Sequence, residues 1–154
     1  MTLHAWRIVK SKLAATAFSG EGARKFGGRW NSPGTPVVYL AGSTSLAILE
    51  MLVRLNAPEL LKRYAVFEVT FSPDLSHTLN PSSLPKNWRQ SPPPPALQRI
   101  GDNWASGNAS ALLQVPSAIV PTEFNYLLNP HHPDFKKITI HPKRPLRFDP
   151  RLLK

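Results

Sequence analysis

Residues 37–55 read VVYLAGSTSLAILEMLVRL and place a strand pattern directly before a helix pattern. The first five residues, Val37–Ala41, are β-branched, aromatic or small and apolar, which is typical of a buried strand. A Ser-Thr pair then offers a helix N-cap, and Ser45–Leu55 predicts a mostly apolar helix. The stretch therefore indicates a strand–helix unit around which the rest of the domain is built.

Further strands and one further helix are expected on either side of this unit. Tyr64–Phe71, YAVFEVTF, alternates cleanly between two faces and predicts a strand. A helix is expected over 96–107, and short strands over 4–9, 117–120, 136–142 and 145–149. The glycine-rich segment 19–36 and the proline-rich segment 72–95 predict a loop and an ordered surface connection. We expect one α+β domain over 1–154, with short mixed or antiparallel strands predominating.

The composition excludes several classes of protein. The chain has 154 residues and no cysteine, which rules out a disulfide framework, a thiol nucleophile and a zinc–thiolate site. It contains no apolar run long enough to span a membrane, and its first residues lack the apolar core of a signal peptide. We expect a cytoplasmic protein with no membrane contact.

The positive charge is concentrated near the end of the chain. Of the formal net charge of +10, residues 136–154 carry +6. Such a basic segment serves nucleic acid, an acidic protein partner or solubility. No helix-turn-helix, zinc-finger or aromatic RNA-binding signature accompanies it, so specific nucleic-acid binding is not favoured.

Glu50 and Arg54 interrupt the apolar surface of the helix, one turn apart. In one interpretation they form a solvent-exposed ion pair that contributes a few tenths of a kcal/mol. In the other, Glu50 lies at the floor of a cleft, near Tyr39 from the preceding strand. The spacing by itself leaves both open.

Arg7 and Arg29 each follow or precede a tryptophan, and Arg29 lies within GGRWN at residues 27–31. A guanidinium supported by an aromatic face suits phosphate or carboxylate recognition. The loop is neither a phosphate loop nor a dinucleotide fingerprint, because a strand rather than a helix follows it. The alternative is a glycine turn whose arginine pairs with an acid.

Ser117 and the adjacent histidines His131 and His132 are further candidates. No G-x-S-x-G elbow surrounds Ser117, so a hydrolase triad is not favoured, and a hydrogen bond to a ligand is the better interpretation. Histidines at adjacent positions point apart in most backbones, which favours a structural role over metal binding.

Taken in order, these segments resemble one family, the RES-domain toxins of bacterial toxin–antitoxin modules. The resemblance covers the chain except for its proline-rich middle and basic end, and it rests on the sequence WRIV, GGRWN, VVYLA, LAILE, IGDNW, VPSAIVP and NYLLNPHHP. The arginine, glutamate and serine that name the family match Arg29, Glu50 and Ser117, and Tyr39 matches a fourth family position.

The resemblance implies a fold similar to that of the ADP-ribosyltransferases of the diphtheria-toxin type, with a cleft for NAD+. It implies a toxin that arrests growth by cleaving the nicotinamide–ribose bond, with inorganic phosphate or water as the acceptor. Protein ADP-ribosylation in the same cleft is the alternative. NAD+ is then a substrate, so no metal or redox cofactor is expected. The expected partner is an Xre-like antitoxin, through which any DNA contact would be made.

The resemblance also implies roles for the matching residues. Glu50 would place negative charge near the ribose, because breaking the glycosidic bond gives an oxocarbenium-like transition state. Arg29, together with Arg7, would hold the pyrophosphate or the acceptor phosphate. Tyr39 would stack on nicotinamide or ribose, and Ser117 would hydrogen-bond the substrate.

Three further residues are expected to contribute to binding. Gly28 would leave room for the substrate, Trp30 would support Arg29, and Asn125 would line the cleft.

The competing hypothesis from another class is a basic module that binds nucleic acid or protein without catalysis.

Overall fold

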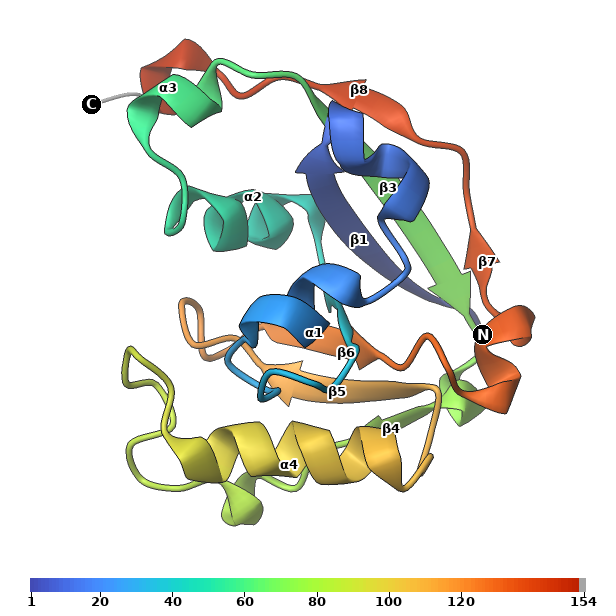
Figure 1. Cartoon of the computed structure of the whole chain (residues 1–154). Helices are drawn as coiled ribbons and strands as arrows, with labels where there is room; N and C mark the ends of the chain where they lie inside the picture. Colours follow the sequence, from blue (N-terminus) through green and yellow to red (C-terminus); the bar gives the residue numbers. More distant parts are fainter. Residues whose placement is uncertain (153–154) are drawn as a thin grey trace.

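The computed structural model describes residues 1–152, and its strands form one curled sheet (Figure 1). The strand order is β4-β5-β6-β2-β1-β3-β7, and β8 also pairs with β3. All pairs are antiparallel except β4–β5. The strands are β1 (Leu3–Lys10), β2 (Val38–Ala41), β3 (Tyr64–Phe71), β4 (Ser76–Thr78), β5 (Leu112–Pro116), β6 (Phe124–Leu128), β7 (Thr139–Ile140) and β8 (Arg144–Leu146).

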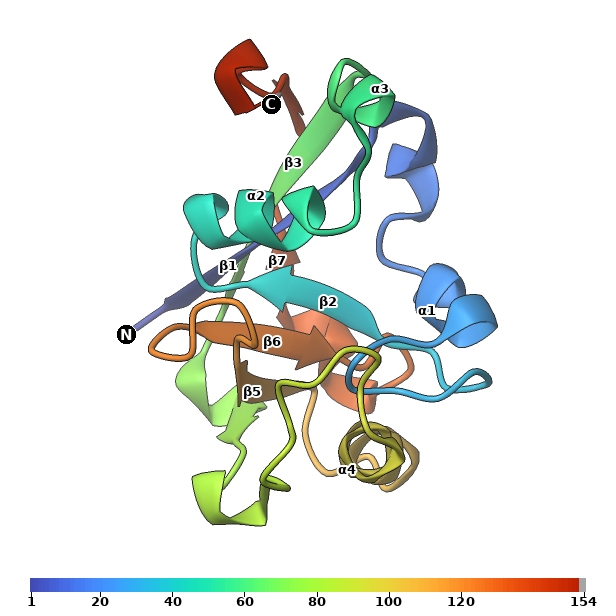
Figure 2. The ribbon, with the colours of Figure 1, turned by 90° about the vertical axis from the view of Figure 1, so that its left-hand side faces the viewer.

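Within residues 1–152, four α-helices accompany the sheet: α1 (Glu21–Phe26), α2 (Thr44–Leu52), α3 (Ala57–Leu60) and α4 (Pro95–Ser106). Figure 2 shows α2 and α4 on opposite sides of the strands β2 and β6. No helix within residues 1–152 combines the length and the apolar character needed to cross a membrane. The expected α+β class is confirmed.

The strand–helix unit at residues 37–55 forms as predicted, but the helix is shorter. The Ser43 hydroxyl accepts a hydrogen bond from the Leu46 amide at 3.0 Å and caps the start of α2. The helix ends at Leu52, three residues before the predicted end. The chain turns there because Asn56 and Glu59 form a capping box that begins α3.

Two segments differ from the sequence-based expectation. The strand expected over 117–120 is wrong: β5 ends at Pro116, and residues 117–123 form a loop. The side chain of Ser117 accepts hydrogen bonds from the amides of Ile119 and Val120, both at 3.1 Å, which turns the chain out of the strand. The sequence analysis also missed β6, whose residues pair with both β2 and β5.

Strands β1 and β2 separate almost as soon as they meet. Within residues 1–152, Trp6 and Ala41 are the one paired position between them, whereas β1 pairs with β3 at eight positions. The sheet therefore divides into two halves. Helix α2 packs on the half that contains β1, and α4 packs on the half that contains β5 and β6.

The basic segment covers one edge of the sheet. Two short final strands form as predicted, β7 and β8, and both pair with β3. Lys137 and Arg151 lie within ion-pair distance of Asp134 and Asp149, at 3.2 and 2.7 Å. Residues 153–154, the last part of the basic segment, lie outside the described residues.

Helix α4 packs closely against the glycine-rich loop. Leu97 and Trp104 are buried, as their helical spacing predicts. Gly101 lies so close to the loop that a Cβ there would be 1.7 Å from the Trp30 carbonyl oxygen. Only glycine allows this approach of helix to backbone.

Replacing Gly101 with alanine tests this contact. The methyl group cannot fit without displacing the Trp30 backbone, so we expect Gly101→Ala to lower the free energy of unfolding by about 2 kcal/mol or more. Chemical denaturation monitored by circular dichroism measures the change. The matched control is Gly22→Ala on α1, where a Cβ meets nothing within 4 Å. This control should be neutral or slightly stabilising, and equal stability of the two variants would contradict the close-packing argument.

Candidate active site

A cavity of about 900 Å³ opens where the two halves of the sheet separate. Its walls come from β1, β2, α1, α2, the glycine-rich loop, the proline-rich connection and the 117–123 loop. This volume is within the range of small-molecule and cofactor sites. Among the residues described, the basic segment contributes nothing to it.

Glu50 extends from α2 to the floor of this cavity. Its carboxylate accepts a hydrogen bond from Asn125 Nδ2 on β6 at 2.8 Å. The ion pair with Arg54 is not formed, because Arg54 Nε instead donates to the main-chain oxygen of Glu50 at 3.3 Å. The arrangement agrees with the cleft interpretation of the helix and leaves a carboxylate facing the cavity.

Asn125 also carries an acceptor without a partner. Its Oδ1 atom is buried and makes no hydrogen bond within the described structure. A buried acceptor without a partner is costly. Asn125 thus fixes Glu50 with its amide nitrogen, while its oxygen stays buried without a partner.

Tyr39 on β2 connects the sheet to the glycine-rich loop. Its hydroxyl donates to Asn31 Oδ1 at 2.5 Å and accepts from the Trp30 amide at 3.1 Å. Burial raises the pKa of Tyr39, so the phenol stays protonated and remains a donor. A Cβ on Gly28 would lie 2.6 Å from this hydroxyl. The room that Gly28 provides is therefore occupied by Tyr39, although Gly28 also lines the cavity.

Asn31 is a residue whose importance the sequence analysis missed. It is fully buried, and its Nδ2 donates to the carbonyl oxygens of Ala23, Ser32 and Thr35. With the bond from Tyr39, its amide organises the whole loop from inside. The signal was present, because a polar amide directly after Gly-Gly-Arg-Trp is typical of a turn-forming side chain.

Arg7 belongs to β1 and lines the cavity, and its side chain reaches β2. Nε donates to the Ala17 carbonyl at 2.6 Å, and Nη1 donates to the Tyr39 carbonyl at 3.0 Å. Burial lowers the pKa of Arg7 to about 10, and the positive charge of Arg54 adds to this effect. Arg7 remains charged at neutral pH, and its bonds to main-chain oxygens join the two halves of the sheet.

Arg29 lines the cavity, but part of its guanidinium has structural partners. Nη1 donates to the carbonyl oxygens of Trp88 and Gln90, both at 2.9 Å. Trp30 is only 2% exposed and packs in the core beneath α4. Its ring thus anchors the loop within the core, and Arg29 holds the proline-rich connection against the cavity.

That connection is part of the site rather than a distant surface segment. Arg89, Ser91 and Pro93 line the cavity. Arg89 Nε donates to the Ala118 carbonyl at 2.9 Å, so the connection lies beside the 117–123 loop on one side of the molecule (Figures 1 and 2). Proline content alone gave no signal for this placement.

Ser117 is not on the cavity wall. Its side chain is fully buried and its hydroxyl accepts the two amide hydrogen bonds that form the loop turn. The next two residues, Ala118 and Ile119, are the ones that line the cavity. In this structure Ser117 positions the loop, and the expected direct contact with a substrate is not available to it.

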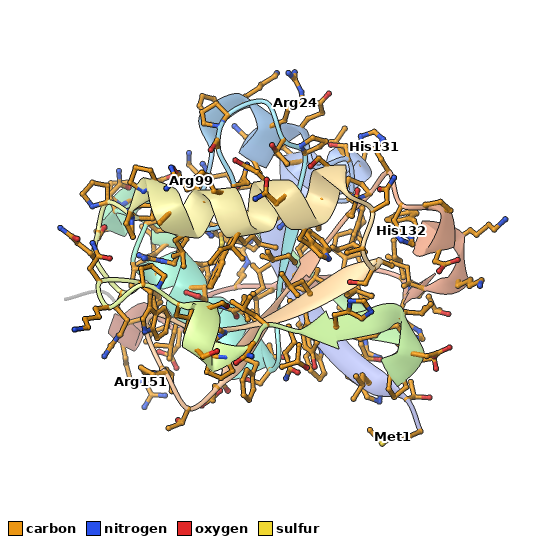
Figure 3. The ribbon with its side chains drawn as sticks, turned by 90° about the horizontal axis from the view of Figure 1, so that it is seen from below. Met1, Arg24, Arg99, His131, His132 and Arg151 are labelled. Atoms are coloured by element: carbon orange, nitrogen blue, oxygen red, sulfur yellow. The ribbon has the colours of Figure 1, made fainter. Side chains whose placement is uncertain are left out.

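Of the adjacent histidines, His132 has structural partners for both ring nitrogens. His132 Nδ1 accepts from the Asp134 amide, and Nε2 lies 3.1 Å from the Asn108 carbonyl. Figure 3 shows His131 and His132 near the C-terminal end of α4. Neither lines the cavity.

Comparison with known proteins gives a consistent result. The family model described as the RES domain matches residues 4–149. A protein of Yersinia enterocolitica named Toxin Res is 40% identical over 149 residues, which is 96% of this chain and 97% of that protein. A Sphingobium protein named Prs ADP-ribosylating toxin is 40% identical over 160 residues, covering 100% of this chain and 99% of that protein.

A solved structure shares the fold. In the crystal structure of the Mycobacterium tuberculosis MbcT–MbcA toxin–antitoxin complex, the match has a TM-score of 0.77 at 22% identity and covers 99% of this chain and 87% of that chain. M. tuberculosis MbcT, named NAD(+) phosphorylase, is 56% identical to this chain over 36 residues, 23% of this chain and 19% of MbcT.

The tyrosine hydroxyl that supports the loop can be removed without removing the ring. We expect Tyr39→Phe to lower the free energy of unfolding by about 1–3 kcal/mol, because Asn31 and the Trp30 amide lose a buried partner. Thermal unfolding measures the effect. The control is Tyr126→Phe, because the Tyr126 hydroxyl makes no hydrogen bond within residues 1–152. A loss of stability in the control as large as that in Tyr39→Phe would argue against a stabilising role of the Tyr39 hydrogen bonds to the loop.

Proposed function

Because this chain belongs to the RES domain family, we propose that it is a toxin of a toxin–antitoxin module that cleaves the nicotinamide–ribose bond of NAD+. The observation that carries the proposal is the Glu50 carboxylate, held by Asn125 on the floor of an arginine-lined cavity of about 900 Å³. The names of the relatives, Toxin Res and NAD(+) phosphorylase MbcT, support the same assignment.

The chemistry requires little from the protein beyond charge and position. The bond from ribose C1′ to the pyridinium nitrogen breaks, its electron pair goes to the ring, and neutral nicotinamide leaves. The ribose becomes oxocarbenium-like, and the negative charge of Glu50 stabilises it. In phosphorolysis an oxygen of inorganic phosphate then forms the new bond to C1′. In hydrolysis water does so, and its proton goes to a base such as Glu50.

The other cavity residues are assigned supporting roles. Asn125 would keep the Glu50 carboxylate oriented toward the ribose through the hydrogen bond from its amide nitrogen. Tyr39 would present its ring edge or face to the nicotinamide–ribose unit while its hydroxyl holds the loop. Arg29, with Arg7, would contribute positive charge for phosphate groups.

A second acceptor deserves a test because of one relative. The Sphingobium protein that is 40% identical over the full chain is named Prs ADP-ribosylating toxin. The same bond cleavage followed by attack of a protein side chain would make this chain a protein ADP-ribosyltransferase. The two activities share the first step and differ only in the acceptor.

Product analysis with an active-site variant tests the proposal. Purified protein is incubated with NAD+, with and without inorganic phosphate, and the products are resolved by chromatography. We expect nicotinamide release by the wild type and a loss of at least about 100-fold in Glu50→Gln, because the charge at the ribose is gone. Exposed Glu123, which does not line this cavity, provides the control Glu123→Gln.

Each outcome selects one acceptor or removes the proposal. Release that depends on phosphate indicates phosphorolysis, and release without it indicates hydrolysis. Release that depends on an added protein fraction, with label transferred to protein, indicates ADP-ribosylation. Intact NAD+ under all three conditions, with a folded and antitoxin-free sample, would remove NAD+ cleavage from consideration.

We also propose that an Xre-like antitoxin covers the mouth of the cavity. Phe26 is 84% exposed and Val53 is 66% exposed, and both line the cavity. Large apolar side chains exposed at a cavity mouth are typical of a protein interface. A partner seated there would bury them and exclude the substrate.

Phe26→Asp tests this interface without touching the core. We expect affinity for the co-expressed Xre-like partner to fall at least about tenfold, because a charge replaces a buried apolar anchor. Calorimetric titration measures it. Leu61→Asp is the matched control, since Leu61 is 65% exposed and lies outside the cavity. Equal effects of the two substitutions would place the interface elsewhere.

A further inference from the structure

Four arginines line the cavity, Arg7, Arg29, Arg54 and Arg89, and none of them has an acidic partner within residues 1–152. The bonds of Arg7 go to two main-chain carbonyl oxygens. Those of Arg54 go to the Glu50 carbonyl and, at 3.8 Å, to Met51 Sδ. These acceptors are neutral, so they orient the guanidinium groups without neutralising them.

The positive charges of Arg7 and Arg54 both lie on the wall of the same cavity. Burial lowers the pKa of Arg7, and the charge of Arg54 lowers it further. The Arg54 charge also acts on the buried phenol of Tyr39. Two positive charges on the wall of one cavity favour the binding of an anion there.

Their positions place such an anion beside the proposed chemistry. Arg54 follows Glu50 by one helical turn and hydrogen-bonds its main-chain oxygen at 3.3 Å. Arg7 hydrogen-bonds the main-chain oxygen of Tyr39. The Glu50 carboxylate itself is directed to Asn125 on the floor, so it does not neutralise either guanidinium.

Arg29 has less freedom for this task. One of its terminal nitrogens is shared between two carbonyl oxygens of the proline-rich connection. Arg54, by contrast, is exposed at the rim and has only weak intramolecular partners. The exposed Arg54 guanidinium can adjust to a ligand, whereas the Arg7 guanidinium is fixed.

We propose that Arg7 and Arg54 form an anion subsite that binds a phosphate group next to Glu50, with Arg54 as its adjustable member. The subsite deepens the proposed NAD+ cleavage and rests on it for its biological meaning. Two sources supply this chemistry: inorganic phosphate as the acceptor, and the diphosphate of NAD+. The binding of phosphate itself needs no turnover and is measured independently.

The test compares Arg54→Gln with Arg99→Gln. Arg54 lies beyond the end of α2 and is exposed, so its replacement leaves the core intact. Arg99 is an exposed arginine on α4 outside the cavity (Figure 3), which makes it a matched loss of one positive charge. Arg7 is less suitable, because its removal would also leave two carbonyl oxygens without their donor.

Isothermal titration measures inorganic phosphate binding to the otherwise wild-type chain, and NAD+ binding in the Glu50→Gln background. We expect Arg54→Gln to lower the affinity for one of these two ligands by about 10-fold or more, because a charge-assisted hydrogen bond is lost. Arg99→Gln should change either affinity by about twofold at most.

The two titrations distinguish inorganic phosphate from the diphosphate of NAD+ as the ligand of the subsite. A loss confined to inorganic phosphate assigns the subsite to the acceptor, and a loss confined to NAD+ assigns it to the diphosphate. Unchanged affinities in Arg54→Gln, losses equal to those of Arg99→Gln, or a parent chain that binds neither ligand would overturn the subsite. Phosphate binding that depends on Arg54 in a chain that leaves NAD+ intact would keep the subsite and remove the proposed function.

Discussion

The separation of β1 from β2 is the constraint on which the rest of the structure depends. The two strands pair at Trp6 and Ala41 and then diverge, so the sheet cannot close over the space between its halves. Polar backbone groups near such a gap need partners. Arg7 supplies them by donating to the carbonyl oxygens of Ala17 and Tyr39 from inside the gap. The same guanidinium thus joins the halves and makes the cavity electropositive.

The glycine-rich loop is the second structural requirement, and α4 fixes it from below. Gln98 donates to the Gly28 carbonyl, and Asp102 accepts from the Ser32 amide, both at 2.9 Å. Between them Gly101 allows the helix to approach the loop backbone. Inside the loop, the side-chain amide of Asn31 donates hydrogen bonds to three main-chain carbonyl oxygens. Most of the conspicuous motif residues therefore act by building a rigid cavity wall, and a few face the ligand space.

This division changes how the family's name residues are understood. Glu50 faces the cavity, where the Asn125 amide fixes its carboxylate. Arg29 faces the cavity and also holds the proline-rich connection. Ser117 is buried and forms a loop turn through its hydroxyl. A rigid wall with pre-positioned charge is what a reaction needs when the leaving group departs without acid help. Arg54 is not one of these three residues, but it also lines the cavity, and its exposed guanidinium is free to meet a ligand.

The sequence by itself determined the elements with strong local periodicity. The strand–helix pattern of residues 37–55 and the alternation of Tyr64–Phe71 depend on neighbours within a few positions, so they could be predicted, as could Glu50 as a cleft candidate. Only the tertiary structure decided the partners of Arg29 and Ser117 and the placement of the proline-rich connection. The bond from Arg29 to Trp88 joins residues 59 positions apart. No local pattern encodes such a contact, because it forms only when the packed sheet and helices bring distant segments together.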